Sequence, residues 1–74
     1  MHPTFEKFLE PILDKSLSPA QRRFYAAREI QFTRQANSML KSSGDTQGLK
    51  VGEEYLNALK ELLEKEGLNL SALF

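Results

Sequence analysis

Few residues of this 74-residue chain have the types and spacing that catalysis or metal binding requires. It has no cysteine, and its one histidine, His2, follows the first methionine, so thiolate sites are excluded and no structural zinc site is expected. Glu53 and Glu54, or Glu61 and Glu64, could form an acid–base pair, but the pattern places them on an exposed, charged helix face. We therefore expect no enzyme activity, no catalytic residue, no metal site and no cofactor.

Three glycines at four-residue intervals, Gly44, Gly48 and Gly52, resemble in spacing a loop that holds phosphate. No Gly-Lys-Ser/Thr sequence follows them, however, and no strand precedes them. We interpret Gly44 as a turn residue, and Gly48 and Gly52 as small residues that let two helix backbones approach closely.

A basic strip is the feature that could contact nucleic acid. Arg23, Arg34 and Lys41 fall on one strip of the middle segment of the chain, with Asn37 nearby, and Arg28 is a further arginine of the same segment. The chain has no recognised DNA-binding motif, and its ten basic residues are balanced by ten acidic ones. A nucleic-acid-binding regulator that uses this strip is therefore the alternative hypothesis rather than the leading one.

Charge is distributed unevenly along the chain. Residues 1–43 hold seven Lys or Arg against four Asp or Glu, whereas residues 44–74 hold three against six. The basic and acidic segments could pair within one chain or between two, or could simply be two solvated faces. No apolar run approaches the roughly 18 residues that cross a bilayer, and no signal peptide is recognisable, so we expect a cytoplasmic location and no membrane span.

The helical pattern is strongest in residues 18–43, which we expect to form a long central helix. Ser18, Pro19 and Gln21 have the types and spacing of a helix start with a capping box, and Gly44 is the residue type that ends a helix. Such a helix is longer than a chain of this size is wide when compact, so the other segments should pack on it.

Two further helices are predicted on either side. Residues 4–15 place five apolar side chains on one face, and Pro11 either kinks this helix or separates two short ones. Residues 47–66 have the clearest apolar face of the chain, with Asp45 or Thr46 as the cap and Gly67 as the end. The first face contains Phe5, Phe8, Leu9, Ile12 and Leu13, and the second contains Gly48, Gly52, Tyr55, Leu56, Leu59, Leu62 and Leu63.

The tail, residues 68–74, is unusually apolar for a chain end, and it must be covered by its own core or by another chain. Together these patterns predict one all-α domain. It is a small antiparallel helical hairpin, made of the long central helix and the last helix, with a short Pro-kinked N-terminal segment packed across it.

The central helix shows two apolar sectors rather than one, and Ile30 belongs to neither. The first sector contains Ala20, Phe24 and Ala27, and the second contains Tyr25, Phe32, Ala36, Met39 and Leu40. A second sector indicates a second neighbour, so we expect a small protein that binds another protein and acts as a regulator, inhibitor, adaptor or assembly factor. The partner could be a different protein or a second copy in a homodimer. The predicted partner-binding residues are Tyr25, Phe32, Met39, Leu40, Arg23, Arg34 and Lys41.

Overall fold

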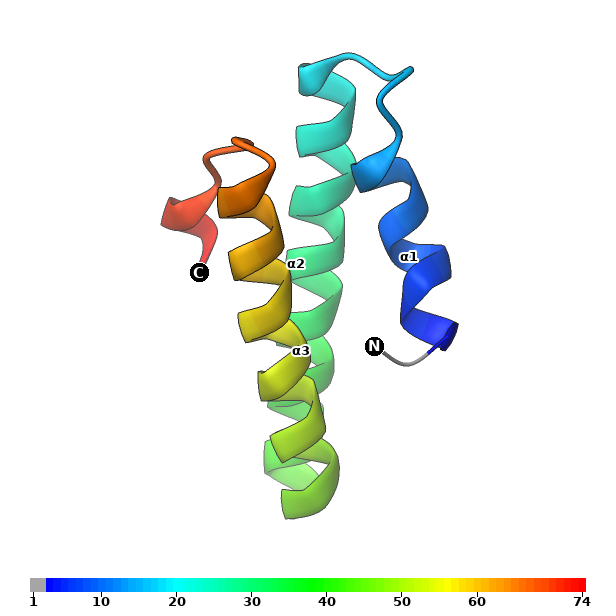
Figure 1. The fold of residues 1–74 in the computed structure, drawn as a ribbon. Coiled ribbons are helices and arrows are strands. Elements are labelled where there is room, and N and C mark those ends of the chain that lie inside the picture. The colour runs from blue at the N-terminus through cyan, green and yellow to red at the C-terminus, as the bar shows by residue number, and fades with distance from the viewer. Residues whose placement is uncertain (1–2) are drawn as a thin grey trace.

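The fold is an antiparallel helical hairpin with a short helix packed across it, as the sequence predicts. A computed structural model describes residues 3–74, apart from the side chains of residues 3–6, Phe8 and Ser71. Its elements are α1 (Pro3–Leu13), α2 (Pro19–Ser43), α3 (Thr46–Lys65) and the short 3-10 helix η1 (Ser71–Leu73). Figure 1 shows α2 and α3 side by side, with α1 and η1 flanking the end of the hairpin opposite its turn.

The start and end of α2 are fixed by local hydrogen bonds. The Gln21 backbone N–H donates to the Ser18 hydroxyl at 3.2 Å, and the Ser18 N–H donates to the Gln21 side chain at 3.0 Å, which completes the predicted capping box. At the other end Gly44 has a φ of 79°, in the left-handed region that glycine adopts without strain. Both boundaries of the central helix are therefore encoded locally.

α3 is likewise bounded by the predicted residues. The Gly48 N–H donates to the Asp45 carboxylate at 2.9 Å, so Asp45 is the cap. After the helix, Gly67 takes a φ of 70°, and the Leu68 N–H donates to the Leu63 carbonyl at 3.0 Å. This turn returns Leu68 to the core, where it is buried.

α1 is one continuous helix, so Pro11 lies in its last turn and does not separate two helices. It ends at Leu13, two residues before the predicted end. The Asp14 carboxylate accepts hydrogen bonds from the Ser16 N–H (2.9 Å) and hydroxyl (2.6 Å), and this local turn replaces a further helical turn. Within the predicted apolar ridge Leu9 and Ile12 are buried and Leu13 is exposed, while the side chains of Phe5 and Phe8 lie outside the described residues.

The face that α2 presents to the core differs from the predicted one. The prediction that Ile30 stands apart is wrong, because Ile30 is almost fully buried at the centre of the core with Ala26. The buried face of α2 follows Arg22, Ala26, Ile30 and Thr33. It passes between the two predicted sectors, because small and polar residues fill most of its positions and hide it from a hydrophobicity pattern.

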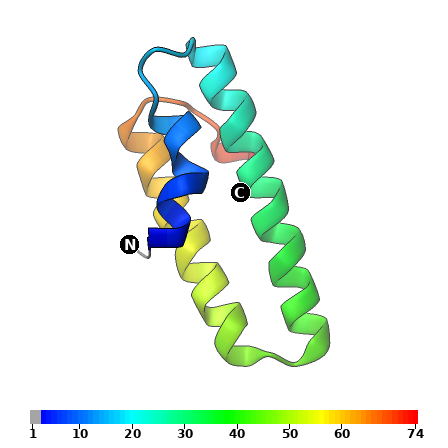
Figure 2. The ribbon, with the colours of Figure 1, turned by 90° about the vertical axis from the view of Figure 1, so that its right-hand side faces the viewer.

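The C-terminal tail packs on the core of its own chain. Leu68 is buried, and Leu70 and Phe74 lie partly buried against the same cluster, while Leu73 remains substantially exposed. Figure 2, turned by 90° from Figure 1, shows α1 in front of the hairpin and the tail passing behind it. The hairpin therefore has a different chain segment on each of its two faces.

A buried arginine joins all three helices. The Arg22 side chain donates through Nε to the Ile12 carbonyl in the last turn of α1 and through Nη2 to the Glu66 carboxylate after α3, both at 2.6 Å. Glu66 also pairs with the exposed Lys15 at 2.6 Å. The Ile12 carbonyl is one of those that a helix end leaves without an internal partner, so Arg22 satisfies it in addition to neutralising Glu66.

Replacing Arg22 by Ala should lower the free energy of unfolding by about 3 kcal/mol, because the Ile12 carbonyl loses its donor, Glu66 keeps only Lys15, and the packing of a buried side chain is lost. Urea denaturation measures this change. Arg23→Ala is the matched control, since Arg23 is the exposed neighbour of Arg22 on the same helix and its loss should cost less than about 0.5 kcal/mol. Equal losses in the two variants would contradict the role given to Arg22.

The cluster of Arg22, Glu66 and Lys15 makes the free energy of unfolding depend on pH in the acidic range. Hydrogen bonds from Lys15, and secondly from Arg22, hold the pKa of the Glu66 carboxyl below its usual range. A lowered folded-state pKa stabilises the protein above the ordinary glutamate pKa of about 4.3, and this stabilisation is lost as the pH falls further. Glu66→Gln should therefore be less stable at neutral pH and should lose less of its stability between neutral pH and pH values below about 4. Denaturation series at several pH values compare it with Glu64→Gln, an exposed control, and parallel pH curves for Glu66→Gln and the wild type would refute the assignment.

Candidate functional site

The candidate site is a groove between α2 and α3, in the half of the hairpin that contains its turn. Its volume is about 320 Å³. Its described lining residues come from the second half of α2 and the first half of α3, and most of them are apolar or small. They are Glu29, Phe32, Thr33, Ala36, Asn37, Leu40, Gly48, Val51, Gly52 and Tyr55.

The groove lies on the face of the hairpin that carries α1. At 100° per residue, Phe32 and Ala36 fall on one side of the buried face of α2. Ala27 and Arg34 fall on its other side, where they lie beside Leu73 of the tail. Since the tail and α1 occupy opposite faces, the groove opens toward the side of α1 (Figure 2). The ribbon of α1 covers only the half of this face that is remote from the α2–α3 turn.

Small and polar residues form the floor of the groove. A Cβ atom built on Gly52 would overlap the side-chain amide of Asn37, so the absence of a side chain at Gly52 lets Asn37 lie against α3. The absence of a side chain at Gly48 serves a different purpose, because a Cβ atom there would lie 2.7 Å from the Asp45 carboxylate that caps α3. Gly52 therefore makes room for a side chain of α2 and Gly48 for the cap, whereas the predicted role of both was to let the helix backbones approach closely.

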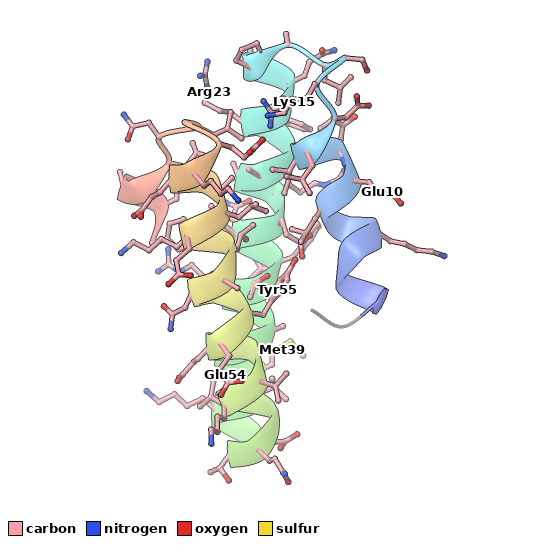
Figure 3. The ribbon with its side chains drawn as sticks, in the orientation of Figure 1. Glu10, Lys15, Arg23, Met39, Glu54 and Tyr55 are labelled. Atoms are coloured by element: carbon pink, nitrogen blue, oxygen red, sulfur yellow. The ribbon has the colours of Figure 1, made fainter. Side chains whose placement is uncertain are left out.

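Exposed apolar side chains form the walls. Phe32 on α2 is 58% exposed and Val51 on α3 is 50% exposed, and both line the groove. Met39, which is 73% exposed, lies beside it on α2. In Figure 3 Tyr55 lies near the level at which α1 begins, and Met39 lies closer to the α2–α3 turn. The groove is thus bordered from both helices by large apolar groups in contact with solvent.

One carboxylate lies in this apolar setting. Glu29 is half-buried, and its Oε1 accepts a hydrogen bond of 2.8 Å from the Tyr55 hydroxyl across the two helices. Burial, and then the hydrogen bond to Glu29 and its negative charge, raise the pKa of Tyr55 well above its ordinary value. The phenol therefore stays protonated and remains a donor to Glu29 throughout the physiological pH range.

The predicted apolar residues divide between the groove and the core. Phe32 and Leu40 line the groove, and Met39 lies beside it. Tyr25 is half-buried against the core instead, with its ring in edge contact with Phe24 at 5.6 Å between centroids. Tyr25 also has the Arg28 guanidinium 5.5 Å from its ring centroid, so it is a packing residue on one side and a cation–π acceptor on the other.

The basic strip is separate from the groove. The Arg34 guanidinium donates to the Leu73 carbonyl at 2.9 Å and so holds the tail against α2. Arg23 and Lys41 are exposed near opposite ends of α2, on the same side of the helix as Arg34. Of the predicted basic residues, Arg34 has a structural contact, and the strip lies on the face opposite to the groove.

Sequence reasoning missed Glu29 and Val51 as site residues. Val51 falls beside the apolar face of α3 and one turn before Tyr55, which is the signal that could have placed it at the edge of a groove. No such signal marks Glu29, because its significance comes from Tyr55, 26 residues away in the chain.

The described part of the chain contains no cluster of three or more His, Cys, Asp or Glu side chains that could hold a metal. Within residues 3–74, no helix combines the length and the apolar character needed to cross a lipid bilayer. Comparisons of the chain with protein-family models, with curated proteins and with solved structures find no match. The function has to be inferred from the groove itself.

The tyrosine at the groove can be titrated alone. The chain has two tyrosines, so Tyr25→Phe leaves Tyr55 as the only phenol. Its ionisation, followed by ultraviolet absorbance, should begin only above the ordinary tyrosine pKa of about 10, and the folded state should lose stability as the pH rises above that value. Adding Glu29→Gln should lower this pKa part of the way toward the ordinary value, since burial remains. An unchanged titration would contradict the Tyr55–Glu29 contact, and Glu53→Gln, on another side of α3, is the control.

Proposed function

We propose that this protein binds another protein by accepting an amphipathic helix of that partner in the groove between α2 and α3. The observation that supports the proposal best is that Phe32 and Val51 expose large apolar surface on the two walls of one groove. Contiguous exposed apolar surface of this kind is typical of a site for another molecule, whereas single scattered apolar residues are not.

The dimensions of the groove suit a helix. From Glu29 to Leu40 it follows α2 for about 17 Å at 1.5 Å per residue, which is close to the length of the 11-residue α1. α1 already packs on the same face through Leu9 and Ile12, so a second helix placed end to end with α1 would continue an existing type of packing. Apolar residues at i, i+4 and i+7 of such a helix would be the expected anchors.

Burial of the groove walls would supply part of the binding free energy. Burying the exposed parts of Phe32 and Val51 should contribute roughly 1–2 kcal/mol each, and Met39 adds flexible apolar surface at the edge. A protein that binds a partner through this groove, and for which we expect no enzyme activity, would act as a regulator, inhibitor, adaptor or assembly factor. The predicted cytoplasmic location belongs to the same proposal.

The proposal can be tested without knowing the natural partner. A displayed library of amphipathic helices about as long as α1 is selected for binding to the full chain, and the affinities of enriched peptides are measured by fluorescence anisotropy. Phe32→Ala should weaken their binding about tenfold or more, because it removes one wall of the groove. Phe24→Ala is the matched control, since Phe24 is an equally exposed phenylalanine on another side of the same helix.

Two results would overturn the proposal. One is a selection that yields no helix whose binding depends on Phe32. The other would come from light scattering behind size exclusion. The proposal predicts a mass near the 8.4 kDa of one chain. A dimer that Phe32→Ala dissociates would assign the groove to a second copy of the chain instead of another protein.

A further inference from the structure

The geometry points to a basic amphipathic helix as the occupant of the groove, with a Lys or Arg of that helix paired to Glu29. This inference rests on the proposed function and adds to it the chemistry that selects the partner. Glu29 is therefore assigned as the specificity-determining residue of the groove, while Phe32 and Val51 supply apolar contact.

The charge of the groove supports this choice. Among the described residues that line it, Glu29 bears the only charge, and none is basic. The nearest cation along the same helix, Arg28, lies against the Tyr25 ring. An arriving helix therefore meets one negative group within an otherwise uncharged groove, so electrostatic complementarity favours a positive residue on that helix.

The hydrogen bonding of Glu29 gives the second argument. A carboxylate offers about four acceptor positions, and Tyr55 occupies one of them from the side of α3. When a bound helix displaces water from the groove, the remaining acceptor positions need a new donor, because a buried carboxylate left without donors is strongly destabilising. A lysine ammonium or an arginine guanidinium supplies that donor together with a compensating charge. A glutamate or aspartate at the same position would be repelled, which excludes acidic helices.

The position of Glu29 also predicts where the basic residue lies. Glu29 is at the end of the groove nearest α1, whereas Phe32, Ala36 and Leu40 follow it toward the α2–α3 turn. The basic residue of the bound helix should therefore stand at one end of its apolar stripe rather than in the middle. Its side chain is long enough to place its methylene groups on the apolar wall while its charged group reaches Glu29.

The test uses the peptides selected on the full wild-type chain. The enriched sequences should carry Lys or Arg at one end of the apolar stripe, and replacing that residue by Gln in a synthetic peptide should weaken binding on the order of tenfold. In the Glu29→Gln chain the basic peptide and its Gln counterpart should bind equally well, which completes a double-mutant cycle. Glu29→Gln keeps an oxygen acceptor for Tyr55, so the groove itself should be preserved, and an unchanged melting curve checks this.

Glu54→Gln is the matched control, because Glu54 is an exposed glutamate on α3 one residue before Tyr55. It should leave the preference for the basic peptide intact. A preference that survives Glu29→Gln would overturn the assignment to Glu29, and so would one that disappears in Glu54→Gln. Peptides that require Phe32 but show no basic preference would also overturn it while leaving the proposed function standing. If no peptide requires Phe32, the proposed function fails first.

Discussion

The arrangement of the three helices depends on the buried guanidinium of Arg22. This guanidinium donates one hydrogen bond to the Ile12 carbonyl at the end of α1 and another to the Glu66 carboxylate after α3, both at 2.6 Å. The bond from Arg22 holds the C-terminal end of α1 beside the first turns of α2. From there α1 runs along the hairpin toward the α2–α3 turn. α2 has 25 residues and α1 has 11, so part of the hairpin face must remain without a covering helix. The groove is thus a consequence of where the charge cluster fixes α1.

The residues of the uncovered half are suited to a groove and would make a poor core. Where α1 packs, Ala26 and Ile30 of α2 meet Leu59 and Leu63 of α3 in one buried cluster. Toward the turn the same side of α2 continues with Thr33 and Asn37, and the facing positions of α3 are Gly52 and Gly48. Small and polar side chains there leave space between the helices instead of filling it. The large apolar groups, Phe32 and Val51, stand at the sides of that space, where a third helix could bury them.

Local signals in the sequence were sufficient for the three helices and for the boundaries of α2 and α3, whereas the face that α2 buries and part of the site were missed. The cap of α2, the glycine at its end and the apolar face of α3 all depend on residues within a few positions of one another. The core face of α2 was not predictable in this way, since two of its four buried residues, Arg22 and Thr33, are polar. Arg22 is satisfied by Ile12 and Glu66, which lie on other segments, and the Thr33 hydroxyl donates to the Glu29 carbonyl one turn earlier. The same holds for the site. Phe32 was predicted from its helical position, whereas Glu29 acquires its role from a hydrogen bond to another helix.

The charge in the groove also bears on whether a second copy could occupy it. The exposed apolar stripe of α2 is formed by Phe32, Ala36 and Met39, which have the i, i+4, i+7 spacing of a helix that binds in a groove. A two-fold, antiparallel pairing of these stripes centred on Ala36 would bring the C-terminal end of the partner's α2 close to Glu29. The carbonyl groups there form the negative end of the helix dipole, and Lys41 lies on the side of α2 that faces the tail. Self-association in this geometry would bury the apolar stripe but would bring the negative end of a helix to Glu29, so the groove is better matched to a different helix that brings its own cation.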